Sequence, residues 1–275
     1  MGKFWIGLLP LAAVFGAGAA SAAAAPLTSH RAIYDISLDH ATTKSPVAQV
    51  SGRLVIEWLD TCDGFTTNQR MYTRLDNAGG GEVASDLWLS SWESRDGQTF
   101  RFSMTTRTNG KIDEASRGTA KRGAAGAKGS VEFEVPRAEV RELPSATLFP
   151  TSQMVALLQA ARAGKRLVSQ TVFDGSAEEG LNDVSTFIGP KSTKAAAPAL
   201  RGARELASGS SWPVRMAFFD PAGTDDFPDY EFAYRMFENG VSSELQFDYG
   251  EFVVKGTLKE IKALADAGCK DAKRP

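Results

Sequence analysis

Two cysteines, Cys62 and Cys269, carry the most definite chemistry in this sequence of 275 residues. They lie too far apart in the chain to form a Cys-x-x-Cys redox motif, so a thioredoxin-like activity is not indicated. In an oxidising compartment an even number of cysteines usually forms disulfides, and two cysteines allow only one intramolecular bond. Chain-entropy theory gives a bond that closes so long a loop a stabilisation of about 5 kcal/mol, as an upper value. The sequence therefore predicts one disulfide, with two free or intermolecularly bonded thiols as the alternative.

Residues suited to catalysis or metal binding are sparse. The only histidines are His30 and His40, and we expect both on the surface. The chain has no Gly-x-Ser-x-Gly motif and no cluster of His and Cys of the kind that binds zinc or iron. The acidic residues between positions 220 and 229 could ligate calcium, but their spacing is not that of an EF-hand, and a solvated turn is the simpler interpretation. We therefore expect a protein that is not an enzyme and that has no cofactor and no metal site.

Aromatic side chains offer another chemical clue. Trp88 and Trp92 lie in one segment, and Phe218, Phe232 and Tyr234 belong to a second, aromatic-rich segment. Packing in a hydrophobic core is the simpler interpretation of these residues. The sharper hypothesis is that they line the inside of a curled sheet and face an apolar ligand or peptide, because such ligands bind in concave apolar surfaces.

The N-terminus has the organisation of a secretory signal peptide. Lys3 is followed by an apolar stretch over residues 4–14 and by small residues up to position 25. We predict a signal peptide over residues 1–25, with a retained N-terminal anchor as the alternative. The remaining chain has no apolar segment long enough to span a bilayer. The net charge of −2 gives no basic excess that would attract nucleic acid.

The rest of the chain, residues 26–275, has the pattern of a single β-rich domain. Tyr34, Ile36 and Leu38 alternate with polar residues, which is typical of a half-buried strand. Two Asn-Gly pairs, Asn109-Gly110 and Asn239-Gly240, each separate two strand-like segments and predict hairpins. Around a dozen or more such strands form a sheet that we expect to curl, because open sheets of this size seldom stay flat.

One segment changes to the period of a helix. Met154, Leu157 and Leu158 recur at helical spacing after Pro150, so residues 151–163 are predicted to form a short amphipathic helix. The side chain of Thr151 or Ser152 is expected to cap its first turn, and Gly164 its end. The predicted fold class is therefore all-β, a large antiparallel curled sheet with one short helix that covers a sheet face.

Several segments resemble the EipB-like cell-envelope integrity proteins of alphaproteobacteria, a family long catalogued as a domain of unknown function. The resemblance covers nearly the whole mature chain. It is carried by His30-Arg31-Ala32-Ile33-Tyr34-Asp35-Ile36-Ser37-Leu38, by Gly52-Arg53-Leu54-Val55-Ile56-Glu57-Trp58, by Cys62-Asp63-Gly64 and Thr67-Asn68-Gln69-Arg70, by Leu148-Phe149-Pro150-Thr151, by Phe173-Asp174-Gly175 and by Cys269.

This resemblance implies a periplasmic protein with a β-spiral-like antiparallel structure. It also implies a disulfide between Cys62 and Cys269 and a role in keeping the cell envelope intact, and it supplies no catalytic residues. Two functions follow from these expectations. The first is a periplasmic scaffold that binds an envelope protein partner, and the second is a carrier of an apolar envelope ligand such as a lipid or a lipoprotein acyl chain.

Overall fold

The structure is a computed structural model that describes residues 27–176, 180–196, 200–224 and 227–265. Within these residues one continuous sheet contains fifteen strands, accompanied by helix α1 (Pro150–Arg162) and a short 3-10 helix, η1 (Arg204–Ala207). The predicted signal peptide and Cys269 lie outside the described residues. The strands are β1 (His30–Ala41), β2 (Val47–Asp60), β3 (Gly64–Asn77), β4 (Glu82–Ser94), β5 (Thr99–Thr108), β6 (Lys111–Lys121), β7 (Gly129–Val135), β8 (Glu139–Leu143), β9 (Leu167–Phe173), β10 (Leu181–Ile188), β11 (Arg201–Gly202), β12 (Ser211–Phe219), β13 (Tyr230–Phe237), β14 (Ser242–Asp248) and β15 (Phe252–Ala263).

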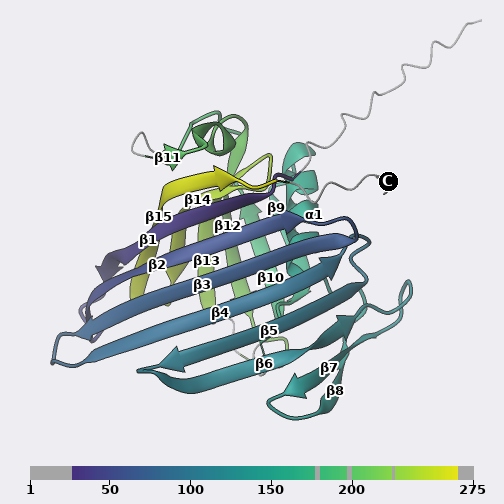
Figure 1. The fold of residues 1–275 in the computed structure, drawn as a ribbon, viewed down its shortest axis with the longest axis horizontal. Helices are drawn as coiled ribbons and strands as arrows, with labels where there is room; N and C mark the ends of the chain where they lie inside the picture. Colours follow the sequence, from purple (N-terminus) through teal and green to yellow (C-terminus); the bar gives the residue numbers. More distant parts are fainter. Residues whose placement is uncertain (1–26, 177–179, 197–199, 225–226, 266–275) are drawn as a thin grey trace, which may run out of the picture.

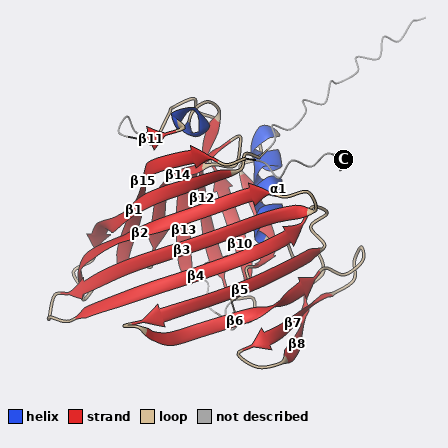
Figure 2. Cartoon of the chain, viewed as in Figure 1, coloured by secondary structure: helices blue, strands red, loops and turns tan. Residues whose placement is uncertain are grey.

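The sheet runs in the order β8-β7-β6-β5-β4-β3-β2-β1-β15-β14-β13-β12-β10-β9, so the first and last strands of the chain are neighbours at its middle. Apart from the short parallel pair of β11 with β15, all neighbouring strands in this sheet are antiparallel. Figure 1 shows the sheet curling, with β2 to β6 in front and the second half of the strands behind them. Figure 2 shows how little of the chain is helical. The prediction of an all-β fold with one large curled sheet is confirmed.

The two Asn-Gly hairpins are confirmed, but their turns differ. Asn109 and Gly110 both have positive φ angles, of 52° and 79°, as a type I′ turn requires. Gly240 has a φ angle of 86°, whereas Asn239 is not among the residues with positive φ. The side chain of Asn239 instead accepts a hydrogen bond from the amide of Val241 at 3.2 Å and donates one to the carbonyl of Leu206 at 2.9 Å. The second turn therefore depends on contacts with another part of the chain.

Helix α1 has the predicted position but a different N-terminal cap. Its N-cap residue is Phe149, which makes no side-chain hydrogen bond there, and Pro150 begins the helix. The prediction that Thr151 or Ser152 caps the helix is wrong, because both residues lie inside the first turn. The cap comes from Glu93 of β4, whose carboxylate accepts hydrogen bonds from the amides of Thr151 at 2.7 Å and Ser152 at 2.9 Å. The end at Gly164, with a φ angle of 72°, is as predicted.

The interior holds three clusters of buried apolar side chains. One lies between β1, β2 and the β14–β15 pair, and a second packs α1 against β9, β10 and β12. The third joins the two ends of the sheet and consists mainly of Phe100, Phe102, Phe133, Phe149 and Phe173. We call this third group the phenylalanine cluster. No helix in the described part of the chain is long and apolar enough to cross a membrane.

Candidate ligand cavity

A cavity of about 340 Å³ lies on the inner face of the curled sheet. One wall is formed by β1, β2 and β3, and the other by α1, β13, β14 and the turn at Gly240. Its aromatic lining residues are Tyr34, Trp58, Phe232, Tyr234 and Phe247. Concave apolar surfaces of roughly 300–1,000 Å³ are the usual sites for small ligands, so this volume is at the lower end of that range.

Strand register places the lining side chains on one face. Trp58 of β2 pairs with His30 of β1 and with Thr67 of β3, and directly opposite residues in neighbouring strands point to the same side of a sheet. On the other wall Phe232 of β13 pairs with Phe247 of β14, and their rings stack with centroids 4.8 Å apart. Because side chains alternate between the two faces along each strand, the apolar residues on the inner face line the cavity.

The two tyrosines of the lining have different surroundings. Tyr34 is almost fully buried, and its hydroxyl donates a hydrogen bond of 2.7 Å to the carbonyl of Ser242. Tyr234 is only partly buried, and its ring stacks on Phe232 at 5.0 Å. Loss of hydration raises the pKa of each phenol. Both tyrosines are therefore neutral at ordinary pH.

The polar groups of the lining carry no fixed charge. None of the described residues that line the cavity is Asp, Glu, Lys or Arg. Nδ1 of His30 lies 2.7 Å from the carbonyl oxygen of Thr28, and it must donate there because the carbonyl only accepts. Burial lowers the pKa of His30, which keeps the imidazole neutral at neutral pH. His30 is thus buried, and the prediction of a surface position for it is wrong.

Trp58 contributes a donor without a partner. Its side chain is 6% exposed, and its ring stacks on Phe65 with centroids 5.2 Å apart. The indole Nε1 is buried and has no hydrogen-bond partner among the described residues. A buried donor that is left unpaired costs free energy, so this indole is suited to a ligand that brings an acceptor.

The predicted ligand-facing aromatics divide between the two faces of the sheet. Phe232 and Tyr234 line the cavity. Phe218 is on the inner side of β12 but stacks on Tyr230 at 4.4 Å and does not line this cavity. Trp88 and Trp92 point to the outer face, where the guanidinium groups of Arg70 and Arg101 lie over their rings.

Sequence reasoning did not select Tyr34, Trp58, Phe247 or the residues that α1 contributes, which include Gln153 and Met154. For Trp58 a signal existed, because it shares its strand parity with the apolar Leu54 and Ile56. The helix residues could not be assigned to this cavity from periodicity, since their position depends on how α1 docks against the sheet.

Glu93 fixes the helical part of the cavity wall. It reaches from β4 to the first turn of α1, and its side chain also accepts a hydrogen bond from the hydroxyl of Ser152. Glu93 is 2% exposed, and burial raises the pKa of its carboxyl while the bonds from Ser152 and Thr151 act in the opposite direction. The same contacts hold α1 in place and occupy the free amides at its positive end.

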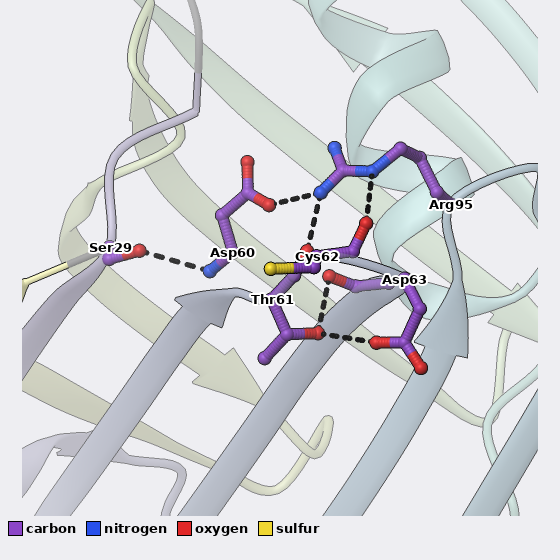
Figure 3. Close-up of polar contacts among 7 residues, drawn as sticks. Ser29, Asp60, Thr61, Cys62, Asp63 and Arg95 are labelled. Carbon is purple, nitrogen blue, oxygen red and sulfur yellow. Dashed lines mark hydrogen bonds and ion pairs between the residues drawn. The ribbon is translucent and has the colours of Figure 1, made fainter. Parts of the chain in front are cut away.

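The turn that carries Cys62 is held by Arg95, as Figure 3 shows. The Arg95 guanidinium makes an ion pair with Asp60 and donates to the carbonyls of Thr61 and Cys62, the latter at 3.4 Å. The amide of Arg95 donates to the carbonyl of Asp63 at 3.0 Å. The turn between β2 and β3 is thereby fixed to the end of β4.

Comparisons with known proteins agree with this fold. A family model described as EipB-like matches residues 21–265. The chain belongs to the EipB-like family. The resemblance predicted from the sequence is therefore confirmed. The chain is 33% identical over 248 residues to the cell envelope integrity protein EipB of Brucella abortus, which covers 89% of this chain and 88% of that protein.

A solved structure of the same kind is similar to this EipB-like chain over most of its length. It is a crystal structure of a β-barrel-like protein of the domain of unknown function DUF1849 from Brucella abortus. The two share 29% sequence identity with a TM-score of 0.80, over 87% of this chain and 99% of the other. In the described part of this EipB-like chain, no group of three or more His, Cys, Asp or Glu side chains is placed to hold a metal ion.

In this EipB-like chain the end of β15 lies next to the turn that carries Cys62. The amide of Leu264, directly after β15, donates a hydrogen bond of 2.9 Å to the carbonyl of Ser29. The hydroxyl of Ser29 accepts a bond of 2.9 Å from the amide of Asp60, two residues before Cys62 (Figure 3). The last described residues after β15 therefore lie close to this turn.

Proposed function

We propose that this EipB-like protein is exported to the periplasm and supports the cell envelope by holding an apolar envelope ligand, without catalysing a reaction. The observation that carries the proposal is the aromatic, uncharged cavity on the inner face of the sheet. The envelope role follows from the name of its Brucella relative, a cell envelope integrity protein. The ligand is a lipid or a single acyl chain, because the cavity presents large apolar surfaces and few polar groups.

The half-buried state of the lining supports this assignment. Phe232, Tyr234 and Phe247 face the interior, yet each keeps part of its surface accessible. An acyl chain that covers them gains favourable free energy in proportion to the apolar area it removes from water, about 25 cal/mol per Å². The ligand thus covers apolar surface that the side chains of the protein leave accessible.

The first test is extraction of the protein from periplasm under native conditions, followed by mass spectrometry of bound lipids. The matched variants are Gln69→Trp and Asn68→Trp, which place the same bulk on the two faces of β3. Gln69 lines the cavity, whereas Asn68 is on the opposite face.

We expect lipid to co-purify with the wild type and with Asn68→Trp, and to be lost from Gln69→Trp. Equal lipid content in all three proteins would place the ligand elsewhere and contradict the proposal. A wild-type protein that carries and takes up no lipid would exclude the carrier function.

We further infer that Cys62 and Cys269 form the one disulfide of the exported protein. The inference is supported by the hydrogen bonds from the amide of Leu264 to the carbonyl of Ser29 and from the amide of Asp60 to the hydroxyl of Ser29. Cys269 is only five positions after Leu264, and an extended chain spans at most about 3.6 Å per residue. Mass spectrometry before and after reduction is expected to show a gain of two hydrogens. Cysteines that react with a thiol reagent without prior reduction would contradict the bond.

A second candidate function, the binding of an envelope protein partner, is favoured by one surface feature. Leu167 of β9 and Phe187 of β10 are paired on the sheet and are 76% and 49% exposed, and β9 is the last strand of the sheet. Exposed apolar side chains beside a sheet edge are a common protein-binding surface.

Cross-linking in the periplasm is expected to recover a specific partner with the wild type and with Val140→Glu, but not with Phe187→Glu. Equal recovery with both variants would exclude this surface.

A further inference from the structure

We propose that the cavity selects an electrically neutral acyl ligand, an ester or amide, whose carbonyl oxygen accepts a hydrogen bond from Nε1 of Trp58. This inference rests on the proposed carrier function and specifies the ligand chemistry. Three features of the cavity carry it: its uncharged lining, the occupied N-terminus of α1 and the unpaired indole.

The lining offers no partner for an ionised group. The described residues around the cavity include no Lys or Arg, and His30 is neutral because it is buried. An ionised carboxylate or phosphate that enters such a site loses its hydration without gaining a counter-charge, which is strongly unfavourable. A free fatty acid in its ionised form is therefore a poor ligand, whereas an ester or amide of the same chain avoids this cost.

Among the described lining residues, the start of α1 could attract an anion, but it is already occupied. Pro150 and Thr151 at the start of α1 line the cavity, and the N-terminus of a helix normally binds anions through its free amides. In this protein the carboxylate of Glu93 accepts from the amides of Thr151 and Ser152. Glu93 thus saturates the site that a fatty-acid carboxylate would use, and its own negative charge repels such a ligand.

The unpaired indole supplies the polar contact for a neutral head. Trp58 lines the cavity and is more than nine-tenths buried, and its Nε1 has no acceptor among the described residues. The indole N–H only donates, so its partner must be an acceptor such as a carbonyl oxygen. Satisfying this donor releases the penalty of leaving it unpaired and fixes the position of the ligand head.

The neighbouring strand strengthens the polar end of the cavity. His30 is the cross-strand partner of Trp58 on the same face of the sheet. Because Nδ1 of His30 donates to the carbonyl of Thr28, Nε2 of the neutral ring is left as an acceptor. The pair thus presents one donor and one acceptor, which matches the carbonyl and the N–H of an amide.

The test compares methyl laurate with laurate, two ligands that have the same acyl chain but different head groups. Their binding is measured by equilibrium dialysis of the radiolabelled compounds at neutral pH. Against the wild-type protein we expect methyl laurate to bind at least about tenfold more tightly than laurate, because only the ionised head must be buried without a partner. This comparison needs no variant and is independent of any effect of mutation on folding.

The variants Trp58→Phe and Trp92→Phe test the role of the indole. Trp58→Phe keeps an aromatic ring but removes the donor, and we expect it to weaken methyl laurate binding by about three- to tenfold, the size of one hydrogen bond. Trp92→Phe makes the same change on the outer face and is expected to leave the affinity unchanged.

Each outcome separates this inference from the carrier function. Binding of laurate as tight as that of methyl laurate overturns the selection of a neutral ligand but leaves the carrier function in place. Equal methyl laurate affinity in wild-type protein and a folded Trp58→Phe variant overturns the hydrogen bond to the indole. If neither compound binds the wild type, the carrier function itself fails.

Discussion

The interior of this protein contains two aromatic regions that differ in which walls supply their rings. In the phenylalanine cluster, rings from β5 and β7 meet rings from β9 and from the segment before α1. Phe173 meets Phe100 and Phe102 edge to face, at interplanar angles of 88° and 73°. In the cavity, Phe232 stacks on Tyr234 and Phe247 at only 21° and 26°, and all three belong to one wall.

The difference shows how aromatic residues can either close a curled sheet or leave it hollow. Rings contributed by both walls interdigitate and fill the space, which joins the two ends of the sheet at the phenylalanine cluster. Rings that stack along a single wall cover that wall and leave volume in front of it. The first arrangement stabilises the fold, and the second leaves the surface on which we propose that the ligand binds.

The largest expected effect is on stability in the phenylalanine cluster. Phe100 is 1% exposed, and Phe100→Ala is expected to lower the free energy of unfolding by about 3–5 kcal/mol, because the cavity left behind cannot collapse. Phe232→Ala at the ligand cavity is expected to cost about half as much or less, because the ring already borders open volume. Urea denaturation of both variants measures the difference. Equal losses would contradict the distinction between a filled and a hollow region.

A second effect concerns pH, at Asp174 directly after Phe173 of the phenylalanine cluster. Burial raises the pKa of Asp174 to about 6, despite a hydrogen bond of 2.9 Å from the amide of Ser176. The folded state thus binds a proton more tightly than the unfolded state, so this contribution to stability is present below pH 4 and is lost as the pH rises to about 6.

Asp174→Asn is expected to remove this pH dependence, which amounts to at most about 3 kcal/mol. Denaturation at a series of pH values, with wild type and variant compared at each, measures the effect. Because the pKa of His30 is lowered by burial in both proteins, its opposite trend cancels in the difference. A constant difference between the two proteins across this range would show that Asp174 has no raised pKa.

A third effect tests the link between β4 and the helical wall of the cavity. Glu93→Gln replaces a carboxylate by a group with one acceptor and one donor, so one amide of the first turn of α1 loses its partner. We expect a loss of about 2 kcal/mol in the free energy of unfolding and weaker ligand binding, because α1 is less firmly placed. Glu132→Gln on the exposed face of β7 is the matched control and is expected to change neither quantity.

The smallest effect is expected on the outer face. Trp88 is 45% exposed, and the guanidinium group of Arg70 lies 4.1 Å from the centre of its ring. Trp88→Ala is expected to cost no more than about 1 kcal/mol and to leave ligand affinity unchanged. A marked loss of ligand binding in this variant would show that the outer face takes part in binding and would sharpen the assignment of faces made above.

Much of the fold was predictable because it depends on local patterns. The alternation of Tyr34, Ile36 and Leu38, the Asn109-Gly110 turn and the helical spacing of Met154 and Leu157 each correspond to the observed element. These signals are local, since the side-chain periods of strands and helices and the φ requirement of the turn act within a few residues.

The faces of the sheet were less predictable. In the sequence, Trp88 and Trp92 cannot be distinguished from an aromatic pair on the inner face. The register of β3 with β4 places both side chains on the outer face. Sequence alternation shows that two residues share a face, not which face is concave. The cap of α1 was missed for a related reason, because Glu93 is distant in the chain and reaches the helix only after the sheet has curled.

From the sequence alone, the all-β fold class, the two Asn-Gly hairpins, the position of α1 and the family could be predicted. Which aromatic residues line the cavity became clear only from the folded chain, because the lining depends on the curl that brings β13 and β14 opposite β1 and β2. The physical reason is that strand and helix formation are governed by neighbours along the chain, whereas a cavity is governed by the packing of walls that meet only in space.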